Sequence, residues 1–427
     1  MFTSALHRAF QFASFAVISY GSAFSAIAQT YTVLHNFMGV AGGDGANPFG
    51  SLILDGSTLY GMTTNGVRVN ASAIVAYNIA TNTEQVVHTF NGDPDGLLPY
   101  GSFIQSGANL YGSTALGGIH GPQGTIFEFN PATNAENVLY SFKGAPTDGY
   151  SPAGTLLQSG SLLYGFTTSG TRGGNAGTIF SFNTTTNTET VLHAFGGGDG
   201  FTPVGAPIQS GVNLYGMTYK GGNNNLGTIF DYDTTTGSES AIYSFGSNPQ
   251  DGISPMGSLL EIGSKLYGMT DLGGSNGAGT IFSFDTLTNT ETTLYSFGSN
   301  PTDGAGPYGS LIHSGDMLYG MTNAGGINGN GEIFSYDMDN GAYAVLHDFD
   351  GTDGSNPFGD LFTAGNTLYG MTDRGGTSED GVIFSVTIPE PTSASLLGLS
   401  AFGLLVRRRR RTDTIGHCLK QGANVDL

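Results

Sequence analysis

The chain repeats one unit of about 50 residues seven times, and this repetition constrains the fold more than any other feature. The clearest marker of the unit is the tripeptide Leu-Tyr-Gly. Its tyrosines are Tyr60, Tyr111, Tyr164, Tyr215, Tyr267, Tyr319 and Tyr369. Successive tyrosines are 51, 53, 51, 52, 52 and 50 residues apart, so no large insertion separates the copies. The repeats therefore form one domain rather than several unrelated ones.

Each copy predicts four short strands separated by clusters of Gly, Asn, Asp and Thr. In the fifth copy these strands are expected at residues 258–260, 266–270, 280–285 and 293–297. Along the third strand, Ile and Ser alternate with two Phe, so both faces of the sheet carry apolar groups. We expect the aromatic face of one sheet to pack on the Ile/Ser/Gly face of the next. Seven such sheets in a ring make a seven-bladed all-β propeller of four-stranded blades.

The two ends of the repeat array are offset by one strand. Residues 32–37 match the fourth strand of later copies, whereas residues 382–385, at the end, match the third strand. The last blade therefore lacks its own fourth strand. The N-terminal strand can supply it, which closes the ring and hides two sheet edges. A linear β-solenoid is the alternative, but a solenoid has no use for this offset.

The net charge limits the classes of binding partner, and the cysteine content indicates where the stability of the domain comes from. Residues 29–388 contain six Lys and Arg against thirty Asp and Glu, a net charge of −24. Such a surface repels nucleic acid and anionic lipid. The single cysteine, Cys418, lies outside the repeats, so stability must come from packing rather than from disulfides. We expect a monomer without a cofactor.

The first 28 residues predict a secretory signal peptide. Arg8 precedes an apolar run at residues 12–27, and the small residues Ala26 and Ala28 place the cleavage site after Ala28. A buried first helix is the alternative. The signal predicts that residues 29–387, the seven-repeat propeller, work outside the cytoplasm.

In our interpretation of the sequence, the only repeated acids are in seven Asp-Gly pairs, each with a Pro three residues after the Gly. They are Asp44, Asp95, Asp148, Asp199, Asp251, Asp303 and Asp353. An Asp in such a turn accepts backbone N–H bonds while the Gly adopts a positive φ, which favours a structural role. Calcium binding is the alternative, because residues 93–95 and 348–353 cluster hard oxygen ligands. Neither segment matches an EF-hand loop.

No catalytic residue is predicted. The chain has no phosphate-binding loop, no His-Glu-x-x-His and no Gly-x-Ser-x-Gly between a strand and a helix. Several histidines and tyrosines share one position in the fourth strand: His35, His88, His193, His347, Tyr140, Tyr243 and Tyr295. This exchange indicates half-buried packing residues rather than ligands.

The basic residues of the repeat domain are unevenly placed. Antiparallel strands put the connections from strand four to strand one (4→1) and from strand two to strand three (2→3) on one face of the ring. Lys265 is the one basic residue predicted on the opposite face. The others are candidate binding residues, because loops of varied chemistry on a rigid scaffold often bind ligands: Arg68, Arg172, Lys220, Arg374 and Lys143. Drift of loop sequence is the alternative.

The repeat motif D-G-x-x-P-x-G-S-L, L-Y-G-M-T, G-T-I-F-S-[FY], L-Y-S-F resembles the GloVer tandem repeat of "choice-of-anchor" surface proteins. The resemblance covers all seven copies, roughly residues 31–387. It implies a surface location and no defined activity. The first copy departs from the pattern, because residues 65–72 lack the Gly-Gly and residues 73–77 replace the aromatic third strand.

The C-terminal segment, residues 388–411, resembles a PEP-CTERM sorting signal. Pro389, Glu390 and Pro391 precede an apolar run, and an arginine cluster beginning at Arg407 and Arg408 follows it. The resemblance implies recognition by an exosortase-type membrane protease, and the arginines favour a cytoplasmic end. An ordinary tail anchor is the alternative. Residues 412–427 form an atypical tail, because such signals normally stop soon after the arginines.

Two function classes follow. The first is an exported, surface-associated, non-catalytic propeller that binds an extracellular matrix glycan, such as an exopolysaccharide, or a surface protein. The second is a secreted glycan-active hydrolase or lyase with its site over the propeller channel. An enzyme of the second kind requires acidic or basic groups that converge from several blades.

Overall fold

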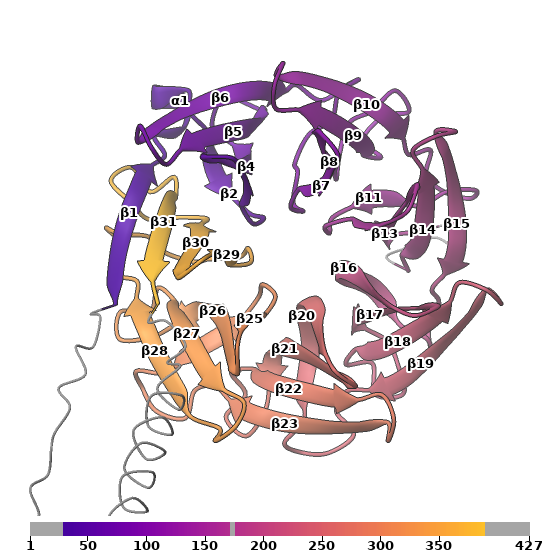
Figure 1. Ribbon diagram of the computed structural model, residues 1–427. Helices are drawn as coiled ribbons and strands as arrows, with labels where there is room; N and C mark the ends of the chain where they lie inside the picture. The colour runs from indigo at the N-terminus through magenta and orange to yellow at the C-terminus, as the bar shows by residue number, and fades with distance from the viewer. Residues whose placement is uncertain (1–28, 171–175, 389–427) are drawn as a thin grey trace, which may run out of the picture.

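The computed structural model describes residues 29–170 and 176–388. Its strands form seven antiparallel sheets in a ring, each with four strands from the channel outward, so the predicted seven-bladed propeller is confirmed (Figure 1). The predicted signal peptide, Arg172, the sorting motif from Pro389 onward and the tail lie outside the described residues. Within the described ranges, no helix is long and apolar enough to span a membrane.

Blades 1 to 4 follow one another along the chain, each running from the channel outward. Blade 1 consists of β2 (Ala46–Pro48), β3 (Ile53–Asp55), β4 (Thr58–Asn65), β5 (Ser72–Asn78) and β6 (Thr83–Phe90). Blade 2 consists of β7 (Ile104–Ser106), β8 (Asn109–Thr114), β9 (Thr125–Asn130) and β10 (Ala135–Ser141). Blade 3 consists of β11 (Tyr150–Pro152), β12 (Leu157–Ser159), β13 (Leu162–Ser169), β14 (Thr178–Asn183) and β15 (Thr188–Ala194). Blade 4 consists of β16 (Phe201–Ser210), β17 (Asn213–Lys220), β18 (Thr228–Asp233) and β19 (Ser238–Ser244).

Blades 5 to 7 complete the ring. Blade 5 consists of β20 (Gly252–Ile262), β21 (Lys265–Gly273), β22 (Thr280–Asp285) and β23 (Thr290–Ser296). Blade 6 consists of β24 (Gly304–Pro307), β25 (Ile312–Ser314), β26 (Met317–Gly325), β27 (Glu332–Asp337) and β28 (Tyr343–Asp348). Blade 7 consists of β29 (Phe362–Ala364), β30 (Thr367–Thr372), β31 (Val382–Thr387) and β1 (Thr30–Asn36). The four-residue helix α1 (Gly39–Gly42) lies in the connection from β1 to β2.

The N-terminal strand closes the ring as the phase of the repeats predicts. β1 pairs antiparallel with β31, from Thr30 opposite Thr387 to Asn36 opposite Val382. The hydroxyl of Tyr31 also donates a hydrogen bond of 2.6 Å to the carbonyl oxygen of Asp353. The first strand of the chain therefore covers the edge that the last strand would otherwise expose (Figure 1).

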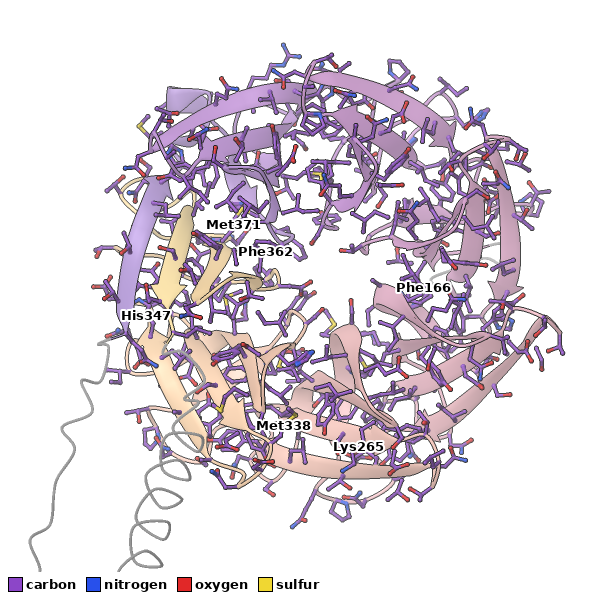
Figure 2. All side chains as sticks on the ribbon, viewed as in Figure 1. Phe166, Lys265, Met338, His347, Phe362 and Met371 are labelled. Carbon is purple, nitrogen blue, oxygen red and sulfur yellow. The ribbon has the colours of Figure 1, made fainter. Side chains whose placement is uncertain are left out.

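Adjacent blades pack through the two faces that the sequence predicts. Ile281 of blade 5 lies in one buried cluster with Phe334 and Tyr336 of blade 6. The equivalent isoleucine packs against the following blade at the other six junctions as well. At the closing junction, Met371 and Phe362 of blade 7 pack with blade 1 (Figure 2). The hydrophobic core is thus divided into seven layers between blades.

This packing explains the Leu-Tyr-Gly marker. In blade 5, Leu266 lies in the cluster shared with blade 4, whereas Tyr267 lies in the cluster shared with blade 6. A Cβ on Gly268 would lie 2.6 Å from the ring of Phe282 on the neighbouring strand. Each residue of the tripeptide therefore has its own packing requirement. Because every blade packs between two neighbours in the same way, the tripeptide recurs in every blade.

The connections lie on the two faces as expected. In blade 3, the backbone N–H of Thr184, in the turn after strand three, donates to the carbonyl of Ser161, in the turn after the inner strand, at 2.9 Å. Turns of these two kinds therefore share one face. The 4→1 and 2→3 connections share the other, where the backbone of Ser151 bonds that of Gln123 at 2.8 Å.

Candidate functional site at the mouth of the central channel

The inner strands surround a cavity of about 470 Å³ in the central channel. The residue between the Pro and the Gly of D-G-x-x-P-x-G lines this cavity in all seven blades. These residues are Phe49, Tyr100, Ala153, Val204, Met256, Tyr308 and Phe358. Blades 6, 7, 1 and 2 supply the aromatic residues, and blades 3 to 5 supply the smaller or flexible ones. At this position the channel therefore has one aromatic side and, opposite it, one side of smaller or flexible residues, called the open side here, where Tyr219 of blade 4 also lines the cavity.

The aromatic side is a continuous wall. The rings of Phe49 and Phe358 stack at 4.9 Å with an angle of 11° between their planes. Tyr100 meets Phe49 edge-on at 5.0 Å, and Tyr308 meets Phe358 edge-on at 4.9 Å. Contacts of this kind hold rings in place, so the wall is preformed.

A girdle of glycine and hydroxyl residues supports the wall. A Cβ on Gly101 would lie 2.5 Å from the carbonyl oxygen of Gly154, and the same clash recurs at the equivalent glycine of every blade. Between these contacts, the backbone N–H of Ser102 donates to Thr155 Oγ1 at 2.9 Å, and that of Ser258 donates to Ser310 Oγ at 2.8 Å. Only glycine permits so close an approach of neighbouring backbones.

Among the described residues that line the cavity, Asp360 is the one acid or base, tyrosines aside. It occupies the girdle position that carries Ser, Thr or Ala in the other blades, and it accepts a hydrogen bond from the backbone N–H of Ser310. Burial raises the pKa of this carboxyl. Two further acids, Asp271 and Asp373, raise the pKa values of Tyr308 and Tyr100 in addition to the effect of burial. The site is therefore acidic as well as aromatic.

Residues with a strained backbone conformation surround the mouth of the central channel. The residue before the Pro has a positive φ of 52–60° in every blade: Asn47, Leu98, Ser151, Thr202, Ser254, Gly306 and Asn356. This conformation lets most of their N–H groups reach the 2→3 loop of the preceding blade, as Ser254 does to the carbonyl of Leu226 at 2.8 Å. Left-handed residues other than Gly are strained, and the bonds between blades offset that strain.

Four of the predicted basic residues are described, namely Arg68, Lys143, Lys220 and Arg374; they lie in different blades, and none of the four lines the cavity. The ammonium of Lys220 lies 5.6 Å from the ring of Tyr219, and both residues border a second hollow of about 370 Å³. Arg374 pairs with Asp373 at 3.4 Å, and its side chain is 67% exposed. Lys143 lies 5.7 Å from the ring of Tyr140, and Arg68 is exposed in its 2→3 loop. Of the four described, Lys220 and Arg374 are beside residues of the channel mouth.

The repeated Asp of each Asp-Gly pair caps its own turn. Every one of the seven carboxylates accepts a backbone N–H from the turn after strand four, as Asp148 does from Lys143 at 2.9 Å. The expected positive φ occurs at Gly45, Gly96, Gly200 and Gly354. It is wrong for the glycines that follow Asp148, Asp251 and Asp303. In those three copies the fourth strand carries a tyrosine eight residues before the Asp, and the inner strand begins at the Gly or directly after it.

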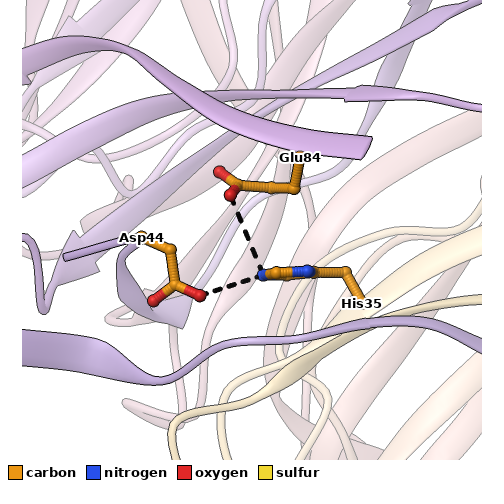
Figure 3. Close-up of side chains that lie close together, drawn as sticks. All are labelled: His35, Asp44 and Glu84. Atoms are coloured by element: carbon orange, nitrogen blue, oxygen red, sulfur yellow. Dashed lines mark hydrogen bonds and ion pairs between the residues drawn. The ribbon is translucent and has the colours of Figure 1, made fainter. Parts of the chain in front are cut away.

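The interpretation that these pairs are the only repeated acids is wrong. A glutamate recurs near the start of the fourth strand in five copies: Glu84, Glu136, Glu189, Glu239 and Glu291. Each reaches toward the His or Tyr of the preceding blade and the Asp of the connection between the two blades, as Glu84 does toward His35 and Asp44 (Figure 3). Burial, with the nearby Asp adding to it, raises the pKa of each to about 7 or 8. In the sequence, each of these glutamates follows Thr, Ala or Ser in a strand of alternating polarity. This pattern is typical of a solvent-facing residue, so it did not indicate a buried acid.

Solved structures with this fold include an oligogalacturonate lyase in complex with manganese, with a TM-score of 0.56 and 15% identity. That likeness covers 84% of this chain and 93% of the other. An oligogalacturonate lyase from Vibrio parahaemolyticus has a TM-score of 0.53 and 13% identity over 84% of this chain and 94% of that one. At these identities the likeness concerns the fold alone.

A search of curated protein sequences gave no match. The family model for the Gloeobacter/Verrucomicrobia repeat matches residues 13–222 and 212–384. These two matches span all seven copies of the unit that packs one blade on the next. The chain therefore belongs to the Gloeobacter/Verrucomicrobia repeat family.

Proposed function

We propose that this propeller binds an extracellular glycan in the channel cavity and does not transform it. The observation that carries the proposal is the preformed aromatic wall opposite an open side, in a cavity of about 470 Å³. The apolar faces of sugar rings stack on aromatic side chains, and their hydroxyls bond to peptide and hydroxyl groups such as those of the girdle. The volume lies within the range typical of small-molecule sites.

The charge of the cavity narrows the class of glycan. Asp360 is a carboxyl without a basic partner among the residues that line the cavity, and the repeat domain carries a net charge of −24. A polyuronate would be repelled, whereas a neutral or amino sugar would not. A glycosidase of the usual kind needs two carboxyl groups flanking the bond, and the described residues of this lining provide one. Binding is therefore favoured over hydrolysis.

We also propose that the propeller works outside the cytoplasm, attached at the cell surface through its C-terminal segment. The support is the pattern of the sequence: the signal peptide ending at Ala28, and the Pro-Glu-Pro motif with its arginines. An exosortase-type protease would be the processing partner. Protease added to spheroplasts should then remove the repeats and spare the extreme C-terminus. Full-length chain found soluble in the cytoplasm would contradict this location.

A glycan array probed with the secreted chain tests the binding proposal. Phe49→Ala removes the centre of the wall, and Ala153→Trp fills the open side, so both should abolish binding of any neutral or amino glycan that the native chain retains. Leu287→Ala is the control, because Leu287 is 81% exposed in the turn between strands three and four, on the opposite face. Unchanged affinity in Ala153→Trp would refute the site. Release of new sugar ends from the bound glycan would replace binding by the enzymatic alternative.

A further inference from the structure

Three of the seven blade junctions bring an imidazole and two carboxylates together. At the junction of blades 7 and 1, His35 Nε2 lies 3.1 Å from Asp44 Oδ2 and 4.0 Å from Glu84 Oε2 (Figure 3). At the junction of blades 3 and 4, the matching distances from His193 to Asp199 and Glu239 are 2.9 and 3.8 Å. Within these two groups the three ligand atoms lie within 4.8 Å of one another. At the third junction, between blades 1 and 2, His88 Nε2 lies 3.5 Å from Asp95 and 3.9 Å from Glu136, but the three ligand atoms do not all lie within 4.8 Å of one another.

The glutamates in these groups lack a complete set of partners. The side chain of Glu84 is 7% exposed and that of Glu239 is 6% exposed. In both, Oε1 is buried and makes no hydrogen bond. No Lys or Arg pairs with either group in the described parts of the chain. A buried carboxylate held beside a second carboxylate is stabilised by a proton or a cation between them.

Other junctions of the same ring show what replaces the imidazole. At the junction of blades 2 and 3 the residue is Tyr140, whose hydroxyl donates to Asp148 at 2.8 Å and lies 3.4 Å from Glu189. The phenol hydroxyl of Tyr140 supplies the proton that lies between these carboxylates, as a hydrogen-bond donor. At the junction of blades 6 and 7, Tyr31 takes the position of the glutamate and stacks on His347 at 3.7 Å. Only His, Asp and Glu together form a set of three ligands.

We propose that the His35–Asp44–Glu84 and His193–Asp199–Glu239 groups each bind a divalent transition-metal ion, with Zn²⁺ as the best match. Zn²⁺ accepts imidazole nitrogen and carboxylate oxygen, and three protein ligands leave a fourth position for water. Ca²⁺ takes six to eight oxygen ligands, which these groups do not offer. The ligands come from β1 or β15, from the following 4→1 loop, and from the fourth strand of the next blade. The ion therefore ties neighbouring blades together.

The chain supplies its own conservative variants for the test. His35→Tyr and His193→Tyr reproduce the residue found at three other junctions, so the variants should fold. Full-length chain is stripped with EDTA and titrated with Zn²⁺ at about pH 7.5 by calorimetry, with bound metal counted by mass spectrometry. Each single variant should lose one ion relative to the native chain, and the double variant should lose two. Ions held elsewhere on the chain cancel in these differences.

Glu84→Gln and Glu239→Gln provide a second reading. They preserve the shape of each junction and remove a ligand charge, so each should weaken Zn²⁺ binding at least tenfold. Zn²⁺ should also raise the melting temperature of the native chain by more than it raises that of the double Tyr variant. Equal metal content in the native and double-variant chains would overturn the proposal and leave a proton between the carboxylates. Tighter binding of Ca²⁺ than of Zn²⁺ would overturn the assignment of the ion.

Discussion

The buried glutamates at the blade junctions predict that the propeller is less stable in alkali, and Glu189→Gln tests this at one junction. Glu189 of blade 3 faces Tyr140 of blade 2 and Asp148 of the connection between these two blades, and its Oε1 is buried without a partner. Burial and the charge of Asp148 raise its pKa from 4.5 to about 8, against smaller opposing effects of Tyr140 and Lys143. This junction has no imidazole, so the Zn²⁺ proposed at other junctions does not affect the stability measured here.

The direction of the effect follows from proton linkage. Between pH 4.5 and about 8 the folded chain holds a proton on Glu189 that the unfolded chain has released. Stability is therefore complete below pH 4.5 and falls as the pH rises, by about 1.4 kcal/mol for each pH unit. Above pH 8 the loss amounts to roughly 4–5 kcal/mol. Gln copies the shape of the protonated carboxyl, so the variant should escape this loss.

Urea unfolding at about pH 5, 7 and 9 with EDTA present measures the difference. Glu189→Gln should equal the native chain within about 1 kcal/mol at pH 5 and exceed it by several kcal/mol at pH 9. Glu261→Gln is the matched control, since Glu261 is an exposed glutamate on the inner strand of blade 5, and its stability should follow the native chain throughout. A difference between Glu189→Gln and the native chain that does not change with pH would refute the reasoning.

Three further changes test the ring. Gly154→Ala places a Cβ on the carbonyl oxygen of Gly205 and should lower stability by more than about 3 kcal/mol in urea unfolding, whereas Gly198→Ala, with open space around it, should change little. Leu98→Asn should raise stability by about 1 kcal/mol in the same assay, because Asn tolerates the φ of 57° better than Leu; a loss would mean that the side chain packs favourably. Deletion of residues 30–36 should expose the edge of β31 and cause aggregation or a large fall in melting temperature, and an unchanged melting temperature would contradict closure by β1.

The number of blades, the order of their strands and the closure of the ring were predictable from the sequence. Each depends on a property that can be measured along the chain: the spacing of Leu-Tyr-Gly, the alternation of Ile with Phe, and the phase of the first and last strands. These patterns recur because each blade meets the same neighbours on both faces. The residues that pack between blades can therefore be identified from the local sequence pattern of each copy.

The channel cavity and the junction groups were decided by tertiary structure alone. Phe49 and Phe358 are separated by nearly the whole domain, and they stack because the last blade closes against the first. Glu84 belongs to a strand that begins a copy later than His35, and only the packing of consecutive fourth strands brings its carboxylate to that ring. A one-dimensional pattern specifies what repeats within a blade. Which side chains meet across a junction, and which varied residues share the channel, depends on the curvature of the closed ring.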